Sequence, residues 1–240
     1  RLGLVLRVVV GGALAGYAIG CLVVLINHVL MVAERMQCQN NLRQVGEGMM
    51  GFVCEHGAFP MPTVYRTREG KPGLSWRVAL LPFLGEAELH ARFRLDEPWD
   101  SPHNLTLLPE MPPCFGTPTP NRDGETTLQV IKGRGFLFDD AFVGPPGGRN
   151  GLLLGRATDD LRDRPEQTLM LAIAKTPVPW TAPDDLEPGE GEPIGESLWL
   201  KGRCHLIGMA DGSSRCAYPN TPLSTWQTWL TIAGCEVIED

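Results

Sequence analysis

The residues that could do chemistry in this chain do not stand in the patterns that catalysis requires. None of the five histidines has a nucleophile or a metal ligand in a recognisable motif beside it: His28, His56, His90, His103 and His205. Cys54-x-His56 could begin a metal site, but no second ligand pair follows it. The chain has no G-x-S-x-G nucleophile turn, no Walker loop and no H-E-x-x-H zinc motif. The sequence therefore predicts no enzyme, no metal site and no cofactor.

The acidic residues favour turns over catalytic pairs. Asn121-Arg122-Asp123-Gly124-Glu125 has oxygen-bearing side chains around a glycine, as a calcium loop does, but the same residues form ordinary turns. Adjacent side chains point apart in a strand, so neighbouring aspartates are better explained as caps and solvated turns than as catalytic carboxylates. Three such pairs occur: Asp139-Asp140, Asp159-Asp160 and Asp184-Asp185.

The first element that must position the rest is a long apolar segment. Val8–Ala33 holds 26 residues without a charged side chain. As a helix it would be ~39 Å long, enough to cross a hydrocarbon core of ~30 Å. A secretory signal has a shorter apolar region and an A-x-A-like cleavage site, which we do not find. We predict a transmembrane anchor over residues 1–33 and an extracytoplasmic domain over residues 34–240.

Three glycines at four-residue intervals lie within this apolar segment. Gly12, Gly16 and Gly20 would let two helix backbones approach closely, which favours self-association or packing in a filament core. The alternative is that glycine is simply common in membrane helices.

The helix is expected to continue to residue 56 with a different character. An apolar stripe at the helical period follows the anchor: Leu42, Val45, Met49, Phe52 and Val53. Gly46, Gly48 and Gly51 each cost about 1 kcal/mol relative to alanine. This half of the helix, residues 34–56, therefore needs a surface to pack against.

The charge distribution favours a domain outside the cytoplasm. The chain of 240 residues has a net charge of −7, and because Arg1 and Arg7 are the only charges before Glu34, the remainder carries −9. An acidic domain argues against nucleic-acid binding. Arg1 and Arg7 precede the anchor, which favours an N-terminus inside and a C-terminus outside, although Arg35 and Arg43 follow it. We predict a single-pass protein of the inner (cytoplasmic) membrane that could also reach the cell surface.

The cysteines leave the disulfide pattern open. Of seven, Cys21 lies in the anchor, and the other six allow 15 pairings. Cys38 and Cys54 would lie ~24 Å apart along one helix and cannot pair. A two-residue Asp211-Gly212 turn would place Cys204 opposite Pro219 and Ile207 opposite Cys216, so we predict that Cys204 and Cys216 do not bond.

The remaining chain alternates short helices and strands. We expect helices over residues 75–81, 86–93, 101–108 and 221–233, strands over 127–131, 135–138, 168–174, 203–210, 213–218 and 235–238, and exposed loops over 144–151 and 177–196. Four tryptophans are assigned to the core, Trp76, Trp99, Trp226 and Trp229, while Trp99 and Trp180, each beside a proline, could also face a partner. The predicted fold is α+β and pilin-like: a long N-terminal helix packed on an antiparallel β-sheet with short accessory helices.

Several stretches together resemble a large paralogous family of prepilin-like proteins of planctomycete bacteria, whose function is unknown. Residues 35–46 are similar to its R-x-x-C-x-N-N-L-K-Q-I-G stretch, residues 75–84 to its S-W-R-V-x-L-L-P-Y-L segment, and residues 95–104 to its L-D-E-P-W-D-S-P-x-N segment. Phe59-Pro60, Val178-Pro179-Trp180-Thr181 and Ala210-Asp211-Gly212-Ser213 also match. The motif residues are Cys38, Asn40, Asn41, Leu42, Trp76, Arg77, Asp96, Glu97, Pro98, Trp99, Asp100, Pro102, Asn104, Asp211 and Gly212.

The resemblance implies a pilin-like domain on a membrane helix, linked to a type II secretion or type IV pilus-like machine. Two departures limit it. The family's cleavage and methylation motif has an acidic residue five positions into the mature chain, which Val8–Ala33 lacks, so peptidase processing and filament entry are not implied. Lys201 stands where the family often has the histidine of His-x9-Asp-Gly, so no site that needs this histidine is carried over.

We therefore predict a membrane-anchored pilin- or pseudopilin-like structural protein of an envelope assembly, without catalysis. Its partners would be the membrane, assembly subunits and other copies of itself. The alternative is a membrane-anchored extracytoplasmic module that binds a saccharide or peptide. A hydrolase ranks third, because the sequence offers no nucleophile–base pair.

Overall fold

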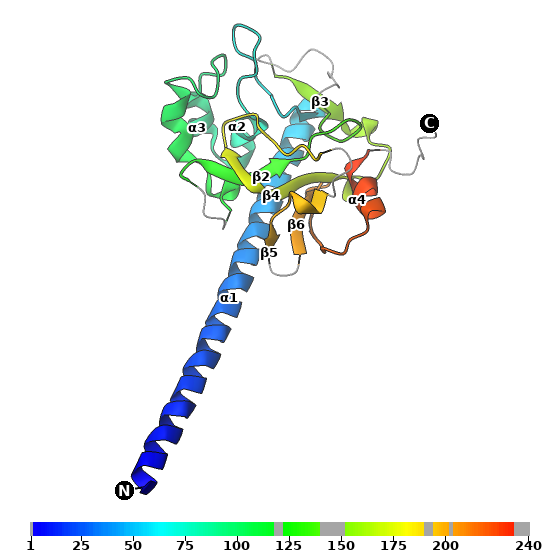
Figure 1. Ribbon diagram of the computed structural model, residues 1–240. Coiled ribbons are helices and arrows are strands. Elements are labelled where there is room, and N and C mark those ends of the chain that lie inside the picture. Colours follow the sequence, from blue (N-terminus) through cyan, green and yellow to red (C-terminus); the bar gives the residue numbers. More distant parts are fainter. Residues whose placement is uncertain (1, 118–121, 140–151, 190–193, 202–203, 233–240) are drawn as a thin grey trace. The chain divides into compact units, whose positions relative to one another are not determined.

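The computed structural model describes residues 2–117, 122–139, 152–189, 194–201 and 204–232 (Figure 1). For residues 2–15 and 201 it describes the backbone alone. Two compact units divide the chain, Arg1–Gln37 and Cys38–Asp240. The predicted loop over residues 144–151 and the predicted strand over 235–238 lie outside the described residues.

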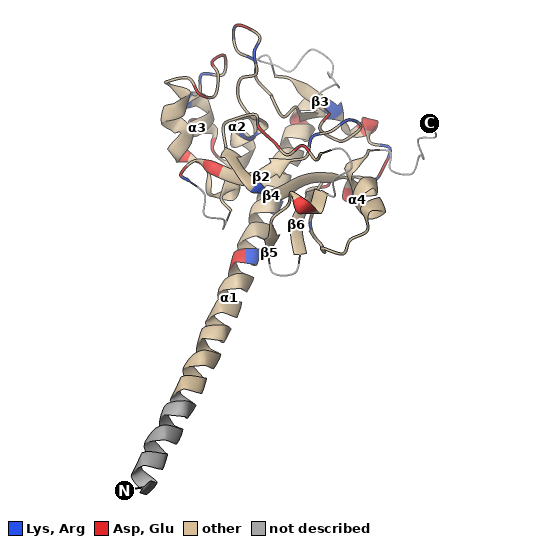
Figure 2. Ribbon diagram, viewed as in Figure 1, with Lys and Arg blue, Asp and Glu red and all other residues tan. Residues whose placement is uncertain are grey.

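Helix α1 runs unbroken from Leu2 to His56. It ends at Gly57, which adopts φ +76° and donates its N–H to the Val53 carbonyl at 2.7 Å, a left-handed helix cap that glycine adopts without strain. By length and composition, the described part of α1 from Gly16 could cross a membrane, and its most apolar window is wholly exposed. In Figure 2 the ribbon of α1 carries no charged residue between Gly16 and Glu34.

The half of α1 beyond Gln37 belongs to the folded domain. Its apolar stripe is buried as predicted, with exposed fractions of 5% or less at every position: Leu42, Val45, Met49, Phe52 and Val53. Cys38, one turn before Leu42, is buried beside them. The helical period seen in the sequence therefore marks the face on which the domain is built.

The main sheet has five antiparallel strands in the order β2-β4-β6-β5, with β7 on the free side of β6. The strands are β2 (Glu125–Val130), β4 (Leu169–Pro179), β5 (Leu200–Lys201), β6 (Cys204–Met209) and β7 (Ser214–Ala217). A separate pair joins β1 (Ala58–Pro60) to β3 (Leu154–Ala157). Strand β4 lies between β2 and β6, which confirms the prediction that the apolar run after Thr168 is central.

Alternation along the strands gives the sheet two buried faces. Leu171 and Leu206 join the cluster that contains the apolar stripe of α1. Ala172 and Ile207, one residue further along each strand, pack instead with Trp226 and Leu230 of α4 (Leu223–Leu230). The predicted α+β class, with a long helix on an antiparallel sheet, is confirmed.

The short helices follow the predicted segments with local differences. They are α2 (Trp76–Ala79), α3 (Ala87–Arg92) and the 3₁₀ turns η1 (Leu81–Leu84), η2 (Asn104–Glu110), η3 (Pro113–Phe115), η5 (Thr158–Asp160), η6 (Pro165–Gln167) and η7 (Ile194–Glu196). The predicted helix from residue 101 is a 3₁₀ helix that starts at Asn104. Residues 135–138 form isolated bridges at Phe136 and Phe138, where we predicted a strand.

The β6–β7 hairpin corrects the predicted register. Its loop has three residues, because Met209 donates its N–H to the Ser213 carbonyl at 2.8 Å and Gly212 adopts φ +83°, a type I turn with a left-handed glycine. Leu206 therefore lies opposite Cys216, where the two-residue turn would have placed Ile207.

This shift brings two cysteines onto one face of the hairpin. Cys204 and Cys216 form a disulfide with their Cα atoms 5.5 Å apart, within the usual range. The prediction that these cysteines do not bond is wrong, because it assumed the shorter turn.

Candidate functional site

The most enclosed polar cluster surrounds Arg77 and Asp185. The side chains of both residues are fully buried, and Arg77 Nη2 donates to Asp185 Oδ1 at 2.7 Å. The other Arg77 donors reach the Leu128 carbonyl, Ser75 Oγ and the Ala182 carbonyl. Every N–H of the guanidinium is thereby used.

Asp185 accepts hydrogen bonds from two elements, α2 and β2. Besides the Arg77 bond, it accepts from Trp76 Nε1 at 3.1 Å and from the Val130 N–H at 3.1 Å. Burial raises the pKa of Asp185 to about 6 against the opposing effect of Arg77, and burial lowers the pKa of Arg77. The cluster is a buried ion pair that ties α2 to β2 and the segment after β4, and the prediction of a solvated turn at Asp184-Asp185 is wrong for Asp185.

The segment after β4 is buried at its start, over residues 180–182, where we predicted an exposed loop, while Asp184 and Glu187 further along it are exposed as predicted. Trp180 is fully buried, donates from Nε1 to the Leu108 carbonyl at 2.9 Å, and stacks on Phe115 with ring centroids 5.9 Å apart. Trp180 therefore does not face a partner. Trp76 and Trp226 are buried as predicted, and Trp99 and Trp229 are half-buried against the core.

Two motif asparagines fasten irregular segments to the helices. Asn41 on α1 donates to the Gly116 carbonyl at 2.7 Å and to the Pro113 carbonyl at 3.3 Å. Asn104 is fully buried, donates to the carbonyls of Arg94 and Pro98, and accepts from the Arg94 N–H. Asn40, by contrast, is exposed and accepts from Arg43.

The motif loop that Asn104 closes has an exposed acidic edge. Asp96 pairs with Arg68, and Glu97 with Arg94 at 3.0 Å. Arg68 holds the pKa of Asp96 below its usual value, and the Ser101 hydroxyl does the same for Glu97. Pro98, Asp100 and Pro102 are exposed. These pairs are solvated and hold the loop shape.

Glycines of α1 form the contact with two other motif segments. A Cβ on Gly46 would lie 2.7 Å from the carbonyl oxygen of Gly212, in the turn that follows Asp211. Gly48 and Gly51 meet Leu84 and Phe83 of η1 in the same way. The three glycines that weaken the isolated helix are therefore the places where the domain approaches its backbone.

The anchor glycines have no such neighbours. A Cβ on Gly16 or Gly20 would meet no atom within 4 Å, and Gly12 lies outside the residues whose surroundings are described. Their role in helix packing stays a prediction.

The remaining candidate residues do not assemble a reactive centre in the described part of the chain. Tyr65 Oη and His90 Nε2 share a hydrogen bond of 3.0 Å, and burial raises the pKa of Tyr65 and lowers the pKa of His90. His56 packs against Phe52, away from any metal partner. Within the described ranges, no group of three His, Cys, Asp or Glu side chains could hold a metal ion. Asp123-Gly124 forms a turn, in which Gly124 adopts φ +80°.

The groove with the best-defined chemistry lies between the sheet and α4. It has a volume of about 510 Å³ and is lined by β4, η7, β5, β6 and α4. His205 lies in its floor, 5% exposed, beside Trp226 at a ring-centroid distance of 6.3 Å. Lys175 and Glu196 are exposed at its rim.

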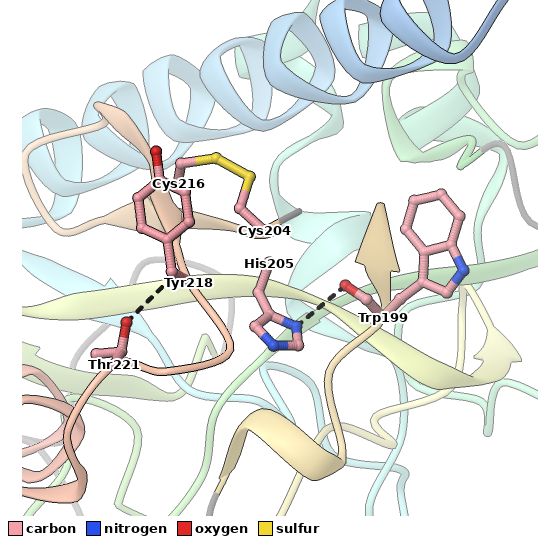
Figure 3. Close-up of a disulfide and its surroundings, with 6 residues drawn as sticks. All are labelled: Trp199, Cys204, His205, Cys216, Tyr218 and Thr221. Carbon is pink, nitrogen blue, oxygen red and sulfur yellow. Dashed lines mark hydrogen bonds between the residues drawn. A yellow bond between two sulfur atoms is a disulfide. The ribbon is translucent and has the colours of Figure 1, made fainter. Parts of the chain in front are cut away.

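The disulfide and His205 occupy opposite faces of β6, because consecutive strand residues alternate (Figure 3). Cys204–Cys216 lies on the face toward α1, and the His205 ring points to the other. The Tyr218 N–H donates to Thr221 Oγ1 at 3.1 Å and fixes the chain between β7 and α4. Sequence reasoning missed His205 as a groove residue, because a lone histidine in a strand gives no signal of its own.

Comparison with known proteins gives one match. Residues 32–151, half of the chain, match the family described as protein of unknown function (DUF1559). The chain belongs to the DUF1559 family. The match to DUF1559 covers the buried half of α1, the Trp76-Arg77 segment and the loop closed by Asn104, which are held by the contacts described above. No curated protein and no solved structure matches the chain.

Proposed function

We propose that this DUF1559 protein is a membrane-anchored, non-catalytic structural protein whose extracytoplasmic domain acts in a pilin- or pseudopilin-like envelope assembly. The observation that carries the proposal is that the two halves of α1 differ in burial. The same helix supplies an apolar segment whose most apolar window has no buried side chain and, beyond Gln37, the buried stripe of the domain core. A wholly exposed apolar helix surface is unfavourable in water and suits lipid or packed partner helices.

The disulfide supports the orientation. Disulfides persist in oxidising compartments and are rare in the cytosol, so Cys204–Cys216 favours a domain outside the cytoplasm. This agrees with the two arginines before the anchor, which favour an N-terminus inside and an acidic domain outside. The proposal assigns no catalytic step, because the polar clusters described above serve to join elements.

The anchor is tested by membrane extraction of the full chain with and without a charge in its apolar segment. Val24→Asp places a carboxylate at a position that is 69% exposed, and a charge near the centre of a spanning helix costs about 2.5–3.5 kcal/mol. We expect the unmodified chain to stay in membranes washed with alkaline carbonate and a larger share of Val24→Asp to appear in the soluble fraction, because the charge offsets part of the insertion energy.

Met36→Lys is the matched control, because this exposed position lies beside Glu34 and Arg35. It should remain in the membrane. Recovery of the unmodified chain in the soluble fraction, or of a mature protein from which the apolar segment has been cleaved, would contradict the proposal.

A second candidate function is an anchored binding module for a peptide. The groove under α4 favours it, because apolar and polar side chains converge there in a volume typical of ligand pockets.

A further inference from the structure

Exposed apolar side chains of the domain are concentrated at the groove under α4. Among the described residues from Cys38 onward, four large apolar side chains are strongly exposed: Leu105, Leu200, Tyr218 and Leu223. Three of them line this groove, including Leu200 on β5 and Leu223 on α4. Leu198 and Trp226 are buried beneath them. Such a concentration of exposed apolar side chains marks a binding surface.

The floor of the groove presents one hydrogen-bond acceptor. His205 Nδ1 lies 3.3 Å from the Trp199 carbonyl oxygen (Figure 3). A carbonyl only accepts, so Nδ1 carries the proton and Nε2 of the neutral ring keeps its lone pair. Burial lowers the pKa of His205, and Lys175 adds to this effect, so the ring is neutral near pH 7.

The free nitrogen of His205 lies on the groove side. A Cβ built on Gly195 of η7 would lie 3.7 Å from Nε2, so the missing side chain of Gly195 leaves room beside this atom. An occupant that fills this room must supply a donor to Nε2, or the acceptor loses its hydrogen bond to water.

We propose that this groove binds an aromatic side chain that carries an N–H or O–H donor, a tyrosine or tryptophan presented by a peptide. The ring would pack between Leu200 and Leu223, and its donor would reach His205 Nε2. Aromatic side chains with a polar tip combine these two requirements.

A peptide fits the rim of the groove better than an isolated ring does. Among the residues that the structure describes, the charged groups at the rim are Lys175 and Glu196, which offer one cation and one anion to backbone carbonyls and amides, a balance that does not favour a phosphate or an acidic polymer. The Lys175 ammonium already donates to the Glu196 carbonyl, which leaves further N–H groups for a ligand. This inference rests on the second candidate function, and it fails independently of the membrane anchor.

The test compares three capped amino acids that mimic a residue within a peptide. The full chain in detergent is titrated by calorimetry with N-acetyl-tyrosinamide, N-acetyl-tryptophanamide and N-acetyl-phenylalaninamide. Phenylalanine has the ring without the donor, and we expect it to bind at least about fivefold more weakly than tyrosine, because it leaves the acceptor unpaired. Equal binding of the tyrosine and phenylalanine amides, or no binding of any amide at about 10 mM, overturns the proposal.

Variants assign the effect to the groove. His205→Leu should abolish the preference for tyrosine over phenylalanine, and Gly195→Val should weaken all three amides by filling the space beside Nε2. Leu105→Ala, which removes an exposed apolar side chain outside the groove, should change nothing. A preference that survives His205→Leu places the amides elsewhere and overturns the assignment.

The pH dependence of binding to the unmodified chain tests the role of His205 without a variant that can misfold. Protonation at acid pH turns Nε2 from acceptor to donor, so the tryptophan amide, whose indole N–H only donates, should lose its advantage over the phenylalanine amide as the pH falls below the ordinary histidine value of about 6.5. The Glu196 carboxylate at the rim is controlled by Glu196→Gln. If free tyrosine binds more tightly than its capped amide, the groove is a site for a free amino acid, and the proposal that a peptide presents the side chain is wrong. Retention of the chain in carbonate-washed membranes is scored separately in every case.

Discussion

A buried guanidinium can hold several segments together because it has five donors in a fixed plane. Arg77 joins α2 to β2, to the carbonyl of Ala182 and to Asp185, and its Cζ lies 4.6 Å from the centroid of the Trp76 ring. Arginine suits this position, since lysine has three donors on a point charge and cannot make the same set of bonds.

Removing either charge of this pair should be strongly destabilising. We expect Asp185→Asn or Arg77→Met to lower the free energy of unfolding by about 3–5 kcal/mol, because the remaining charge is buried without its partner. Urea denaturation followed by tryptophan fluorescence measures the change.

The exposed pair of Arg94 and Glu97 is the control for this prediction. Glu97→Gln should leave the denaturation midpoint almost unchanged, because exposed ion pairs contribute little. Equal effects of Asp185→Asn and Glu97→Gln would mean that the buried pair is not a strong constraint.

His205 should make stability depend on pH in a defined direction. Its folded-state pKa lies below the unfolded value of about 6.5, so below that pH the unfolded chain binds more protons than the folded chain. The contribution of His205 to stability is therefore present above about pH 6.5 and falls as the pH is lowered. His205→Asn should flatten the dependence of the denaturation midpoint between about pH 5 and pH 7, and an unchanged slope would show that His205 titrates as an ordinary exposed histidine.

At the scale of elements, the glycines of α1 have opposite expected effects in its two halves. Gly46→Ala gains about 1 kcal/mol of helix propensity, but its Cβ would overlap the backbone of Gly212. We expect a net loss of stability of about 1–3 kcal/mol, because a backbone neighbour cannot rotate away. Gly20→Ala, which meets no atom within 4 Å, should not lower the stability of the domain. Thermal unfolding of both variants decides whether the Gly46 contact is as close as described.

The hairpin disulfide should contribute stability in proportion to the loop that it closes. With a sequence separation of 12, the chain-entropy estimate is about 3 kcal/mol. The double variant Cys204→Ser/Cys216→Ser should therefore unfold at lower denaturant concentration, and a reducing agent should shift the midpoint of the unmodified chain but not of the variant. A midpoint that the reducing agent leaves in place would argue that this bond does not form.

Periodicity predicted the elements that bury a continuous stripe or run. The stripe from Leu42 to Val53 and the central strand around Leu171 repeat apolar residues at regular spacing, so a single sequence reveals them. The tight hairpin was located by Asp211-Gly212, but its register was not, because the same pair serves two- and three-residue loops. One residue of difference decided whether Cys204 could reach Cys216.

Contacts between distant segments left no periodic signal. Asp185 follows another aspartate in a proline-rich stretch, a context typical of solvated turns, and its burial depends on Arg77 arriving from more than one hundred positions earlier in the chain. The Gly46–Gly212 approach is similar, because glycine alone does not reveal which backbone will approach it. The groove at His205 could not be predicted either, since its walls come from elements that only the fold brings together.

At the scale of the whole molecule, the account depends on where the domain lies relative to a membrane. Cys54 is exposed on the half of α1 that belongs to the domain, while Cys21 lies in the apolar half. The most direct test is labelling of intact spheroplasts that express the Cys21→Ser/Cys235→Ser chain with a membrane-impermeant maleimide, with Cys21→Ser/Cys54→Ser/Cys235→Ser as the control. The account predicts labelling of Cys54 without lysis and loss of that signal in the control. Labelling of Cys54 only after the membrane is broken would place the domain in the cytoplasm and contradict it.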